Sequence, residues 1–492
     1  MKIFRFVANN SVLTLFFMLV LNAIIPISIQ GQVKKAMNKV DSLRRIALPL
    51  VCIDTEGAVD PQYKEIYPPT GCEGASITDN DFVQGRMIIS LLDSVLYDSG
   101  NYKSGESGMR IRVRGNTSTI FYSQKPYKLK LSKKADLLFR KDKKYKNKNW
   151  ALLSTQMDGN LTFTMAGLQL SRLVGMSWEP ETSFVNVVLN GRYLGLYNLI
   201  ETIERSDSRI QTADNGFVIE NDPYWWNEGD EYFKTTHQQS FLGYTFKYPD
   251  YEDMDLQRIQ QIQSVMQSAE DVLWSDEDAS QWFDYPSFAR WILSHDILGT
   301  KDGLGSNMFY VMEDMDADGK ALSPIKAGPL WDFGSMLWCD SADWSVPHTY
   351  PYTFLYALFK REAFVKEYIH LFESVKPTLM NSLQTYFDDF LANNGQAIEE
   401  SIVLDNPDYV HVDKQVADMM ASLSARMLTI ERLLKRDYPT LGIETIKAKN
   451  HNSLEKRVSI LGRDFTNWQS QELPKGFYIE RMSDGTVRKI KR

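Results

Sequence analysis

Three oxygen-bearing side chains stand at spacings that suit the chemistry of a phosphate group. Asp302 and Asn307 lie five residues apart in a glycine-bearing segment, and Asp332 opens an Asp-Phe-Gly sequence further along. Mg²⁺ takes hard oxygen ligands in octahedral geometry and neutralises charge on nucleotide phosphates. Asn307 and Asp332 are therefore candidate metal ligands, and Asp302 is a candidate for the group that orients an attacking hydroxyl.

The order of segments around these residues matches the order that protein kinases use. The sequence predicts a helix that ends near Leu298, a loop with Asp302 and Asn307, two strands, and then Trp331-Asp-Phe-Gly. In kinases this order brings a catalytic Asp and two metal ligands to the nucleotide phosphates. Each piece alone is common in large proteins. Because Asp302 follows Thr-Lys rather than His-Arg, and no Ala-Pro-Glu comes later, an ordinary protein kinase is excluded.

A cationic strand upstream supplies candidate phosphate contacts. Alternation over residues 109–113 predicts a strand with one apolar and one cationic face, and Arg114 and Gly115 follow where the strand ends. A glycine turn at this point lets backbone amides approach a phosphate closely. Arg114 and Gly115 are therefore candidate nucleotide-binding residues.

A second predicted strand, Tyr127-Lys-Leu-Lys-Leu, carries two lysines on one face. One of them is expected to pair with the α- and β-phosphates. Lys130 is favoured by analogy with a kinase strand that ends in Ile-Lys, and Lys128 stays as the other candidate. Asp158 and Glu201 are the acids that could pair with this lysine, with helix capping as the alternative role for Asp158.

Strand patterns dominate the first half of the chain and helical patterns the second. Asn190-Gly191 between two apolar runs predicts a tight hairpin, and Gly175 ends a helix predicted over 161–174. Helical spacing recurs over 256–273, 285–298, 361–393 and 416–436. Strands first and helices later predict an α+β fold with a strand-rich first lobe and a helix-rich second lobe.

The composition limits the class of protein. The 492 residues are 24% charged and 43% hydrophobic, which suits a globular chain too long for one ordinary domain. Collagen-like, coiled-coil and disordered classes are excluded. The formal net charge of −8 argues against a protein that binds nucleic acid by neutralising its phosphates, so nucleic acid is not an expected partner.

The N-terminus predicts export. Lys2 and Arg5 precede an apolar run, and Gly31 lies near the expected end of a signal peptide over 1–31. A membrane anchor is the alternative, but the run is short for a bilayer core. The mature protein is therefore expected to be secreted, periplasmic or on the outer cell surface, without an integral membrane span. Cys52 and Cys72 could form a disulfide in such a compartment, and the sequence leaves this open.

In combination these motifs resemble the CotH family, spore-coat protein H and its bacterial relatives, which are atypical kinases with a kinase-like fold. The resemblance runs over about residues 48–339. Its carriers are Arg112-Val-Arg-Gly-Asn-Thr-Ser, Lys125-Pro-Tyr-Lys-Leu-Lys-Leu, Trp150-Ala-Leu-Leu-Ser, Val188-Leu-Asn-Gly-Arg-Tyr-Leu-Gly-Leu-Tyr-Asn-Leu-Ile-Glu, Asp302-x4-Asn307 and Trp331-Asp-Phe.

The resemblance implies a function and a set of cofactors. The expected reaction is transfer of the γ-phosphate of ATP, with Mg²⁺ or Mn²⁺, to Ser or Thr of a secreted or surface protein. It assigns the catalytic role to Asp302 and metal binding to Asn307 and Asp332, and the first motif adds Asn116 to the nucleotide-binding residues. Since the cell exterior holds little ATP, the alternative is an inactive kinase-fold surface scaffold or adhesion protein.

The C-terminal end differs from the kinase-like part, which is expected over 32–440. Residues 441–492 are rich in basic residues, and two short strands are predicted around Asp484-Gly485. This region resembles the C-terminal sorting domain of type IX secretion. A small structural hairpin is the alternative.

Overall fold

The computed structural model describes residues 39–73, 76–156, 161–229, 231–250, 253–300, 307–337, 355–405, 411–441, 454–459, 477–482 and 487–491. The chain divides into two compact units, Met1–Leu433 and Leu434–Arg492. Strands come first and most helices later, so the predicted α+β class with a strand-rich N-terminal part is confirmed.

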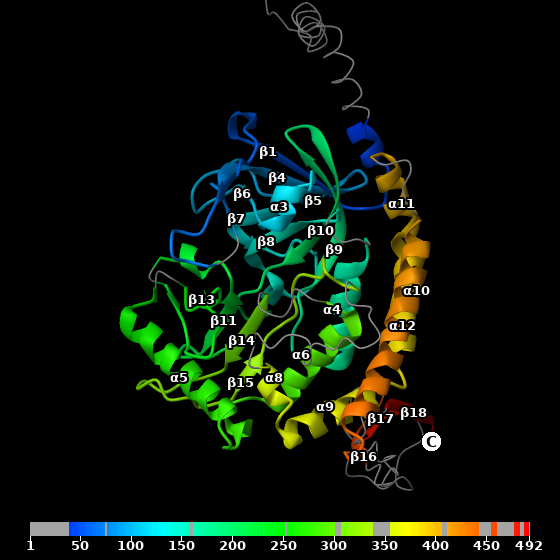
Figure 1. Ribbon diagram of the computed structural model, residues 1–492. Coiled ribbons are helices and arrows are strands. Elements are labelled where there is room, and N and C mark those ends of the chain that lie inside the picture. The colour runs from blue at the N-terminus through cyan, green and yellow to red at the C-terminus, as the bar shows by residue number, and fades with distance from the viewer. Residues whose placement is uncertain are drawn as a thin grey trace, which may run out of the picture. The chain divides into compact units, whose positions relative to one another are not determined.

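The strands of the first half form an eight-stranded sheet that closes on itself (Figure 1). Its order is β1-β9-β10-β8-β7-β6-β4-β5, and β1 also pairs with β4, so seven strands form a closed ring and β5 extends from it by pairing with β4. We call it the barrel. Its strands are β1 Leu50–Thr55, β4 Val83–Leu91, β5 Ser94–Asp98, β6 Met109–Val113, β7 Tyr127–Ala135, β8 Asn147–Ser154, β9 Thr182–Leu189 and β10 Arg192–Glu201.

Side-chain alternation decides which residues enter the barrel core. On β7, Tyr127, Leu129 and Leu131 are buried in that core, whereas Lys128 and Lys130 point to the outer face. The arginines of β6 alternate with core residues in the same way. The cationic faces predicted from the sequence therefore lie on the outside of the barrel.

Small elements border the barrel. β2 (Lys64–Ile66) and β3 (Ile77–Asp79) pair with each other, and α3 (Thr117–Phe121) links β6 to β7. The hairpin predicted at Asn190-Gly191 is confirmed, because both residues have positive φ, 49° and 76°, between paired strands β9 and β10.

A second sheet of five strands follows in the order β12-β13-β11-β14-β15. Its strands are β11 Phe217–Asp222, β12 Tyr232–Phe233, β13 Gly243–Tyr248, β14 Met308–Met312 and β15 Ile325–Ala327. Helix α5 (Leu256–Trp274) packs against β12, and α6 (Tyr285–Leu298) packs against β15 (Figure 1). Both helices begin at aspartates, Asp255 and Asp284, whose carboxylates accept hydrogen bonds from first-turn amides.

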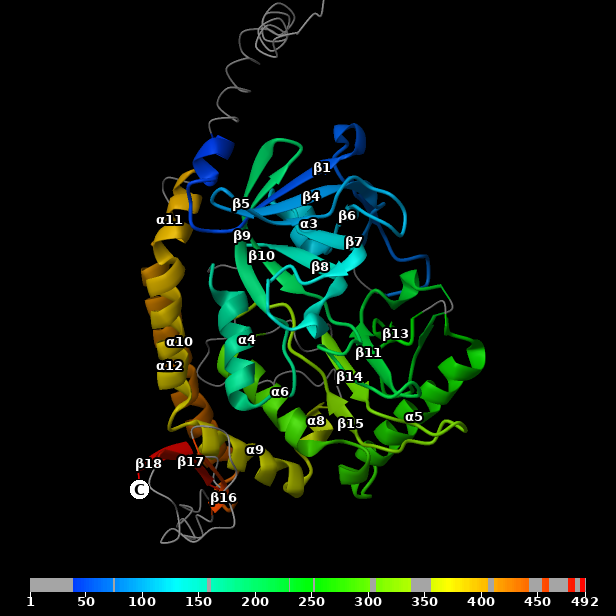
Figure 2. The same cartoon turned by 180° about the vertical axis from the view of Figure 1, so that it is seen from behind.

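Helix α4 (Phe163–Val174) packs against α6 and ends at Gly175 with φ of 100°, as predicted. The remaining described helices come after β15 in the chain. They are α8 Leu355–Leu358, α9 Glu362–Val375, α10 Leu379–Phe390, the π-helical η6 Leu391–Gly395, α11 Gln396–Val403 and α12 Val412–Asp437. Figure 2 shows α10 alongside α4, a contact within the first unit. The single helix predicted over 361–393 is wrong, because Pro377 separates α9 from α10.

The described residues of the C-terminal unit include a three-stranded antiparallel sheet. Its strands are β16 Leu454–Ser459, β17 Phe477–Met482 and β18 Val487–Lys491. Pairing of β17 with β18 confirms the predicted hairpin, although the turn at Asp484-Gly485 lies outside the described residues. The buried ion pair Arg457–Glu480, at 2.6 Å, ties β16 to β17. That the C-terminal unit serves as a sorting domain stays a prediction.

Several sequence predictions concern the chain ends and the cysteines. The predicted leader over 1–31 lies outside the described residues. Among the helices of the described part, none is long and apolar enough to cross a membrane. Cys52 and Cys72 are free thiols, so the disulfide that the sequence left open is not formed.

Candidate functional site

Asn307 and Asp332 are the two predicted metal ligands, and the structure describes both. They lie at one end of the strand pair β14–β15. Asn307 immediately precedes β14, and Asp332 follows β15 after a short connection. These strands are antiparallel, with Tyr310 opposite Ala327, and the Gly328 amide donates to the Phe309 carbonyl at 2.7 Å. The start of β14 therefore meets the end of β15, which brings Asn307 and the Asp332 segment to the same edge.

The backbone at both positions is unusual. Asn307 has φ of 57° and Asp332 has φ of 62°, and left-handed backbone is uncommon for residues other than glycine. One carboxylate oxygen of Asp332 accepts the Gly334 amide at 3.2 Å. Asn and Asp tolerate this conformation better than most residues, and such outliers concentrate at functional sites.

The Asp332 segment is packed against α4 through its next residue. Phe333 is buried, and a Cβ placed on Gly167 of α4 would lie 2.1 Å from its ring. Only a glycine at position 167 allows the phenyl ring this close to the helix. The Asp-Phe-Gly sequence is therefore held against the helix that precedes β9.

Cations on the outer face of the barrel reach this segment. The Arg114 guanidinium lies over the Trp331 ring at 5.2 Å from its centroid, and the Asp332 charge acts on Arg114. Burial lowers the pKa of Arg114, against the opposing effect of Asp332. The structure thus joins the end of the cationic strand to the Asp-Phe-Gly segment.

Lys128 belongs to the same cationic face. It lies opposite Arg112 in the β6–β7 register. Burial lowers the pKa of Lys128 to about 8, and the charges of Arg112, Lys247 and Arg114 act in the same direction. Among the described residues, the charge of Glu204 opposes them. We call Arg112, Arg114 and Lys128 the cationic cluster.

Lys130 lies further along β7 and is exposed. Its register partners are Arg110 and Asn149. Of the two lysines that the sequence offered, the structure places Lys128 in the cationic cluster and Lys130 outside it.

The turn after β6 has the predicted glycine geometry. Gly115 has φ of 77°, and a Cβ there would lie 2.3 Å from the Ser118 hydroxyl. The Asn116 side chain accepts the Thr78 amide at 2.9 Å, and the Thr78 hydroxyl donates to the Gly115 carbonyl at 2.8 Å. These bonds from β3 fix the shape of the turn next to Arg114.

The position of Glu201 requires a correction. Its carboxylate accepts from Arg140 at 2.8 Å and from the Glu181 amide at 3.0 Å, and Arg209 lies 3.8 Å away. Glu201 continues the alternation of Leu199, a barrel-core residue, and therefore faces away from the cationic cluster. It is an ion-pair residue of the barrel, and Glu204 takes the place next to Lys128.

Glu204 was not found by sequence reasoning. Its carboxylate accepts from Asn149 at 2.8 Å and also contacts Arg209. Burial raises the pKa of Glu204, against the effects of Arg209, Asn149 and Lys128. Only its place three residues beyond Glu201 marks it in the sequence, which is a weak signal.

The second sheet supplies further charges that the sequence did not identify as functional. Glu220 on β11 pairs with Lys247 on β13 at 2.6 Å. Asp222, two residues on, has its pKa raised to about 7 by burial and by Glu220. Glu228 acts on both Lys247 and Arg112. In the sequence, these acids could have been recognised from the alternate positions of Glu220 and Asp222 after the apolar start of β11.

The remaining predicted residues cannot be placed in this geometry. Asp302 and Asp158 lie outside the described residues, so their roles stay predictions. Within the described part of the chain, no three His, Cys, Asp or Glu side chains are grouped to hold a metal ion.

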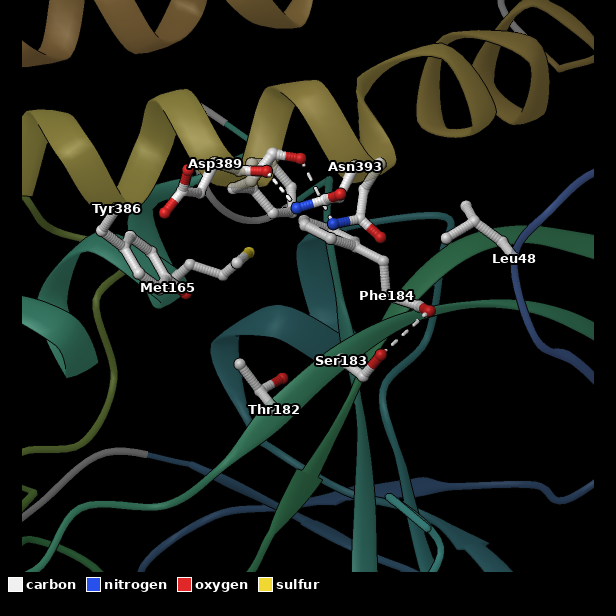
Figure 3. A pocket seen from close by; sticks show the side chains of 10 residues that line it. Leu48, Met165, Thr182, Ser183, Phe184, Tyr386, Asp389 and Asn393 are labelled. Atoms are coloured by element: carbon white, nitrogen blue, oxygen red, sulfur yellow. Dashed lines mark hydrogen bonds between the residues drawn. The ribbon is translucent and has the colours of Figure 1, made fainter. Parts of the chain in front are cut away.

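A cavity of about 270 Å³ lies elsewhere, between α4, β9 and α10 (Figure 3). Met165, Phe184 and Phe390 supply apolar walls, and Tyr386 and Asn393 supply polar ones. Met165 is two residues from Gly167, so it lies on the opposite side of α4 from Phe333. This cavity is separate from the candidate site.

Comparison with known families identifies the class of protein. The sequence profile described as CotH kinase protein matches residues 111–407, more than half of the chain. The chain therefore belongs to the CotH kinase protein family, and the resemblance found in the sequence is confirmed. The family implies a protein-kinase-like transferase, and for such enzymes ATP and a divalent metal in general.

Other comparisons add little. A solved complex of the Shewanella oneidensis MR-1 toxin–antitoxin proteins HipA and HipB with operator DNA aligns at 14% identity, with a TM-score of 0.27. The match covers 58% of this chain and 58% of that chain, so our chain spans little more than half of its length. At this TM-score the alignment carries no argument. No curated protein matches the sequence.

Proposed function

We propose that the protein is a secreted atypical kinase with a two-lobed, kinase-like arrangement. It transfers the γ-phosphate of ATP to Ser or Thr of a secreted or surface protein, and nucleic acid is not a partner. The single observation that carries this proposal is the contact between Arg114 and the Trp331-Asp332 segment. It joins a cationic face of the barrel to the oxygen donors at the edge of the second sheet.

The residues present fit a nucleotide with a divalent metal. Arg114 and Lys128 supply positive charge, and the pKa of Lys128 is lowered by burial and then by the charges of Arg112, Lys247 and Arg114, so a bound anion would favour its charged form. Gly115 allows backbone amides to approach an anion. Asn307 and Asp332 offer the hard oxygen donors that Mg²⁺ and Mn²⁺ take.

Each residue then has a role in the proposed reaction. Arg114 and Lys128 bind and orient the phosphates, while Asp332 and Asn307 hold the metal. The metal neutralises charge on the phosphates as the γ-phosphoryl group is transferred. Asp302 orients the attacking hydroxyl. Glu204 keeps Lys128 in place.

The location and the partner belong to the proposal as well. The predicted leader supports export, and we propose that the basic C-terminal unit, with β17 and β18, serves as a sorting signal. The protein substrate would then meet the enzyme outside the cytoplasm.

Asp332→Asn tests the metal assignment. Asn tolerates the φ of 62° and keeps an acceptor for the Gly334 amide, so the fold should persist while the charge is lost. We expect the stabilisation by ATP with Mg²⁺, about 2.7 kcal/mol at a hundred times the dissociation constant, to disappear together with transfer of label to secreted proteins. Thermal unfolding and incubation with labelled ATP measure both.

Asp316→Asn is the matched control. Asp316 lies in the turn at the far end of the same β14–β15 hairpin, where its carboxylate accepts the Asp318 and Lys320 amides. This variant should behave as the wild type. Metal-dependent nucleotide binding that survives in Asp332→Asn would remove Asp332 from the site.

Asp302→Asn separates the enzyme from the alternative of an inactive scaffold or adhesion protein. Transfer should fall by orders of magnitude while ATP affinity stays within a few-fold, because orienting the nucleophile matters mainly in the transition state. Bound nucleotide without transfer in the wild type would favour the scaffold.

A further inference from the structure

A buried carboxyl group lies behind the Asp-Phe-Gly segment. Glu179 follows α4 in the connection to β9 and is only 3% exposed. Its two oxygens lie 3.2 and 3.1 Å from the Leu330 amide, which donates to them. Leu330 stands two residues before Asp332, so this bond holds the backbone that leads directly into the candidate metal ligand.

The surroundings of Glu179 favour a neutral hydrogen-bond acceptor. Burial raises its pKa to about 8, against the effects of the Leu330 amide, the Ser171 hydroxyl and Arg172. Arg172 donates instead to the Glu179 and Pro180 carbonyls, at 3.4 and 2.5 Å. Apart from the Ser171 hydroxyl, the side chain of Glu179 acts on the backbone at Leu330, whose amide lies within hydrogen-bond distance of both carboxyl oxygens.

The segment 330–333, which contains Asp332, is held at two further points. Trp331 lies under Arg114, and Phe333 packs on Gly167 of α4. Both of those contacts act on side chains, whereas the bond from Glu179 acts on the main chain. Backbone position matters here because Asp332 has a left-handed φ of 62°, a conformation that its surroundings must impose.

We propose that Glu179 is a positioning residue that sets the backbone of residues 330–332 and thereby aims the Asp332 carboxylate at the metal. The inference rests on the proposed function. A leucine or methionine could fill the same space without the cost of burying a polar group. The hydrogen bond to the Leu330 amide then explains why a carboxyl group stands at position 179.

The experiment compares three substitutions of Glu179 by titrating Mn²⁺ into the full chain with a non-hydrolysable ATP analogue. Glu179→Gln keeps a carbonyl acceptor of the same length and should bind Mn²⁺ within about threefold of the wild type. Glu179→Met removes the acceptor and should weaken Mn²⁺ binding about 10–100-fold, as loss of an outer-shell partner typically does. Affinity for the analogue without metal should stay within about twofold, because the cationic cluster is untouched.

Glu270→Met is the matched control for a purely structural role. Glu270 on α5 is equally buried and accepts from Thr235 at 2.5 Å and from Tyr244 at 2.7 Å, within the second sheet and its helix. This variant should lose stability without any change in Mn²⁺ affinity. Glu179→Asp, whose shorter side chain falls short of the Leu330 amide, provides a second test if Glu179→Met does not fold.

The outcomes separate this inference from the proposed function. Wild-type Mn²⁺ affinity in folded Glu179→Met or Glu179→Asp would overturn the positioning role and leave the kinase proposal intact. A wild type that binds the analogue but not Mn²⁺ would overturn both, as would a wild type that binds neither. Equal losses in Glu179→Met and Glu270→Met would show that general destabilisation is the cause.

Discussion

Two groups of charges on the barrel wall differ in how they are balanced. On the core side of β10, Glu201 is surrounded by Arg140 and Arg209, and Asp136 also pairs with Arg140 at 3.0 Å. On the outer side, the three cations of the cationic cluster are acted on by acids from several segments of the described chain: Glu204 acts on Lys128, Asp79 and Glu228 act on Arg112, and Asp332 and Glu220 act on Arg114. The first group is held together by direct ion pairs, whereas among the described residues no ion pair joins a cation of the cluster to an acid.

This difference separates structural charges from those that await a ligand. Buried charges that are paired and hydrogen-bonded cost little to keep, and removal of one partner is strongly destabilising. A buried cation without a direct ion pair is costly, and neighbouring cations add to the cost: burial first, and then the charges of Arg112, Lys247 and Arg114, lower the pKa of Lys128. An anion such as a nucleotide phosphate would relieve that repulsion. Substitutions on the two sides should therefore change different properties.

The largest effect on stability should come from Glu201→Leu. It leaves Arg140 and Arg209 with fewer acceptors in a buried setting and leaves the Glu181 amide unbonded. We expect a loss of about 3 kcal/mol in the free energy of unfolding, measured by chemical denaturation at pH 7. Nucleotide affinity of the folded fraction should not change. Glu201→Gln, which retains one of the two acceptor oxygens, should lose less, and a loss of nucleotide affinity in either variant would return Glu201 to the binding site.

Lys128→Met should act in the opposite direction on stability. The substitution removes the cost of burying the charge of Lys128 and the repulsion from its neighbouring cations, so the free energy of unfolding should rise by about 1–2 kcal/mol at pH 7. Nucleotide affinity should fall about 10–100-fold because a desolvated phosphate partner is lost. Denaturation and equilibrium binding of ATP measure the two quantities. A destabilised variant with unchanged affinity would contradict the comparison.

The pH dependence of this effect has a definite sign. The pKa of Lys128 is about 8 in the folded protein, below its usual value near 10.5, so the unfolded chain binds more protons between these values. Wild-type stability relative to Lys128→Met should therefore rise as the pH increases from about 8 to about 10.5, and the two proteins should converge above that range. Denaturation across this pH range measures it.

The sequence predicted the parts of this arrangement that depend on local pattern. Alternation on β7 placed Lys128 and Lys130 on one face, and Asn190-Gly191 and Gly175 marked a turn and a helix end. These features follow from strand period and backbone preference. Alternation shows which face of a strand a side chain occupies but not how deeply it is buried. It therefore could not distinguish Lys128, in the cationic cluster, from the exposed Lys130.

The rest of the site depends on long-range packing. Glu201 was misassigned because closure of the barrel, through pairing of β1 with β4, decides which face of β10 is inside. Glu204, Glu220 and Lys247 reach the cationic cluster from segments far from β7 in the sequence. Nothing in the spacing of these residues indicates that they meet.

The smallest effect should come from Lys130→Met, which sharpens the comparison by changing the same residue type on the same strand face. Lys130 is exposed, so water already screens its charge. We expect the free energy of unfolding to change by less than about 0.5 kcal/mol, as for most surface substitutions, and ATP affinity to stay within about twofold. Denaturation and ATP binding beside Lys128→Met provide the measurement. A tenfold loss of affinity in Lys130→Met, with Lys128→Met unaffected, would show that the kinase analogy chose the correct lysine, and that burial beside other cations does not identify the phosphate-binding residue.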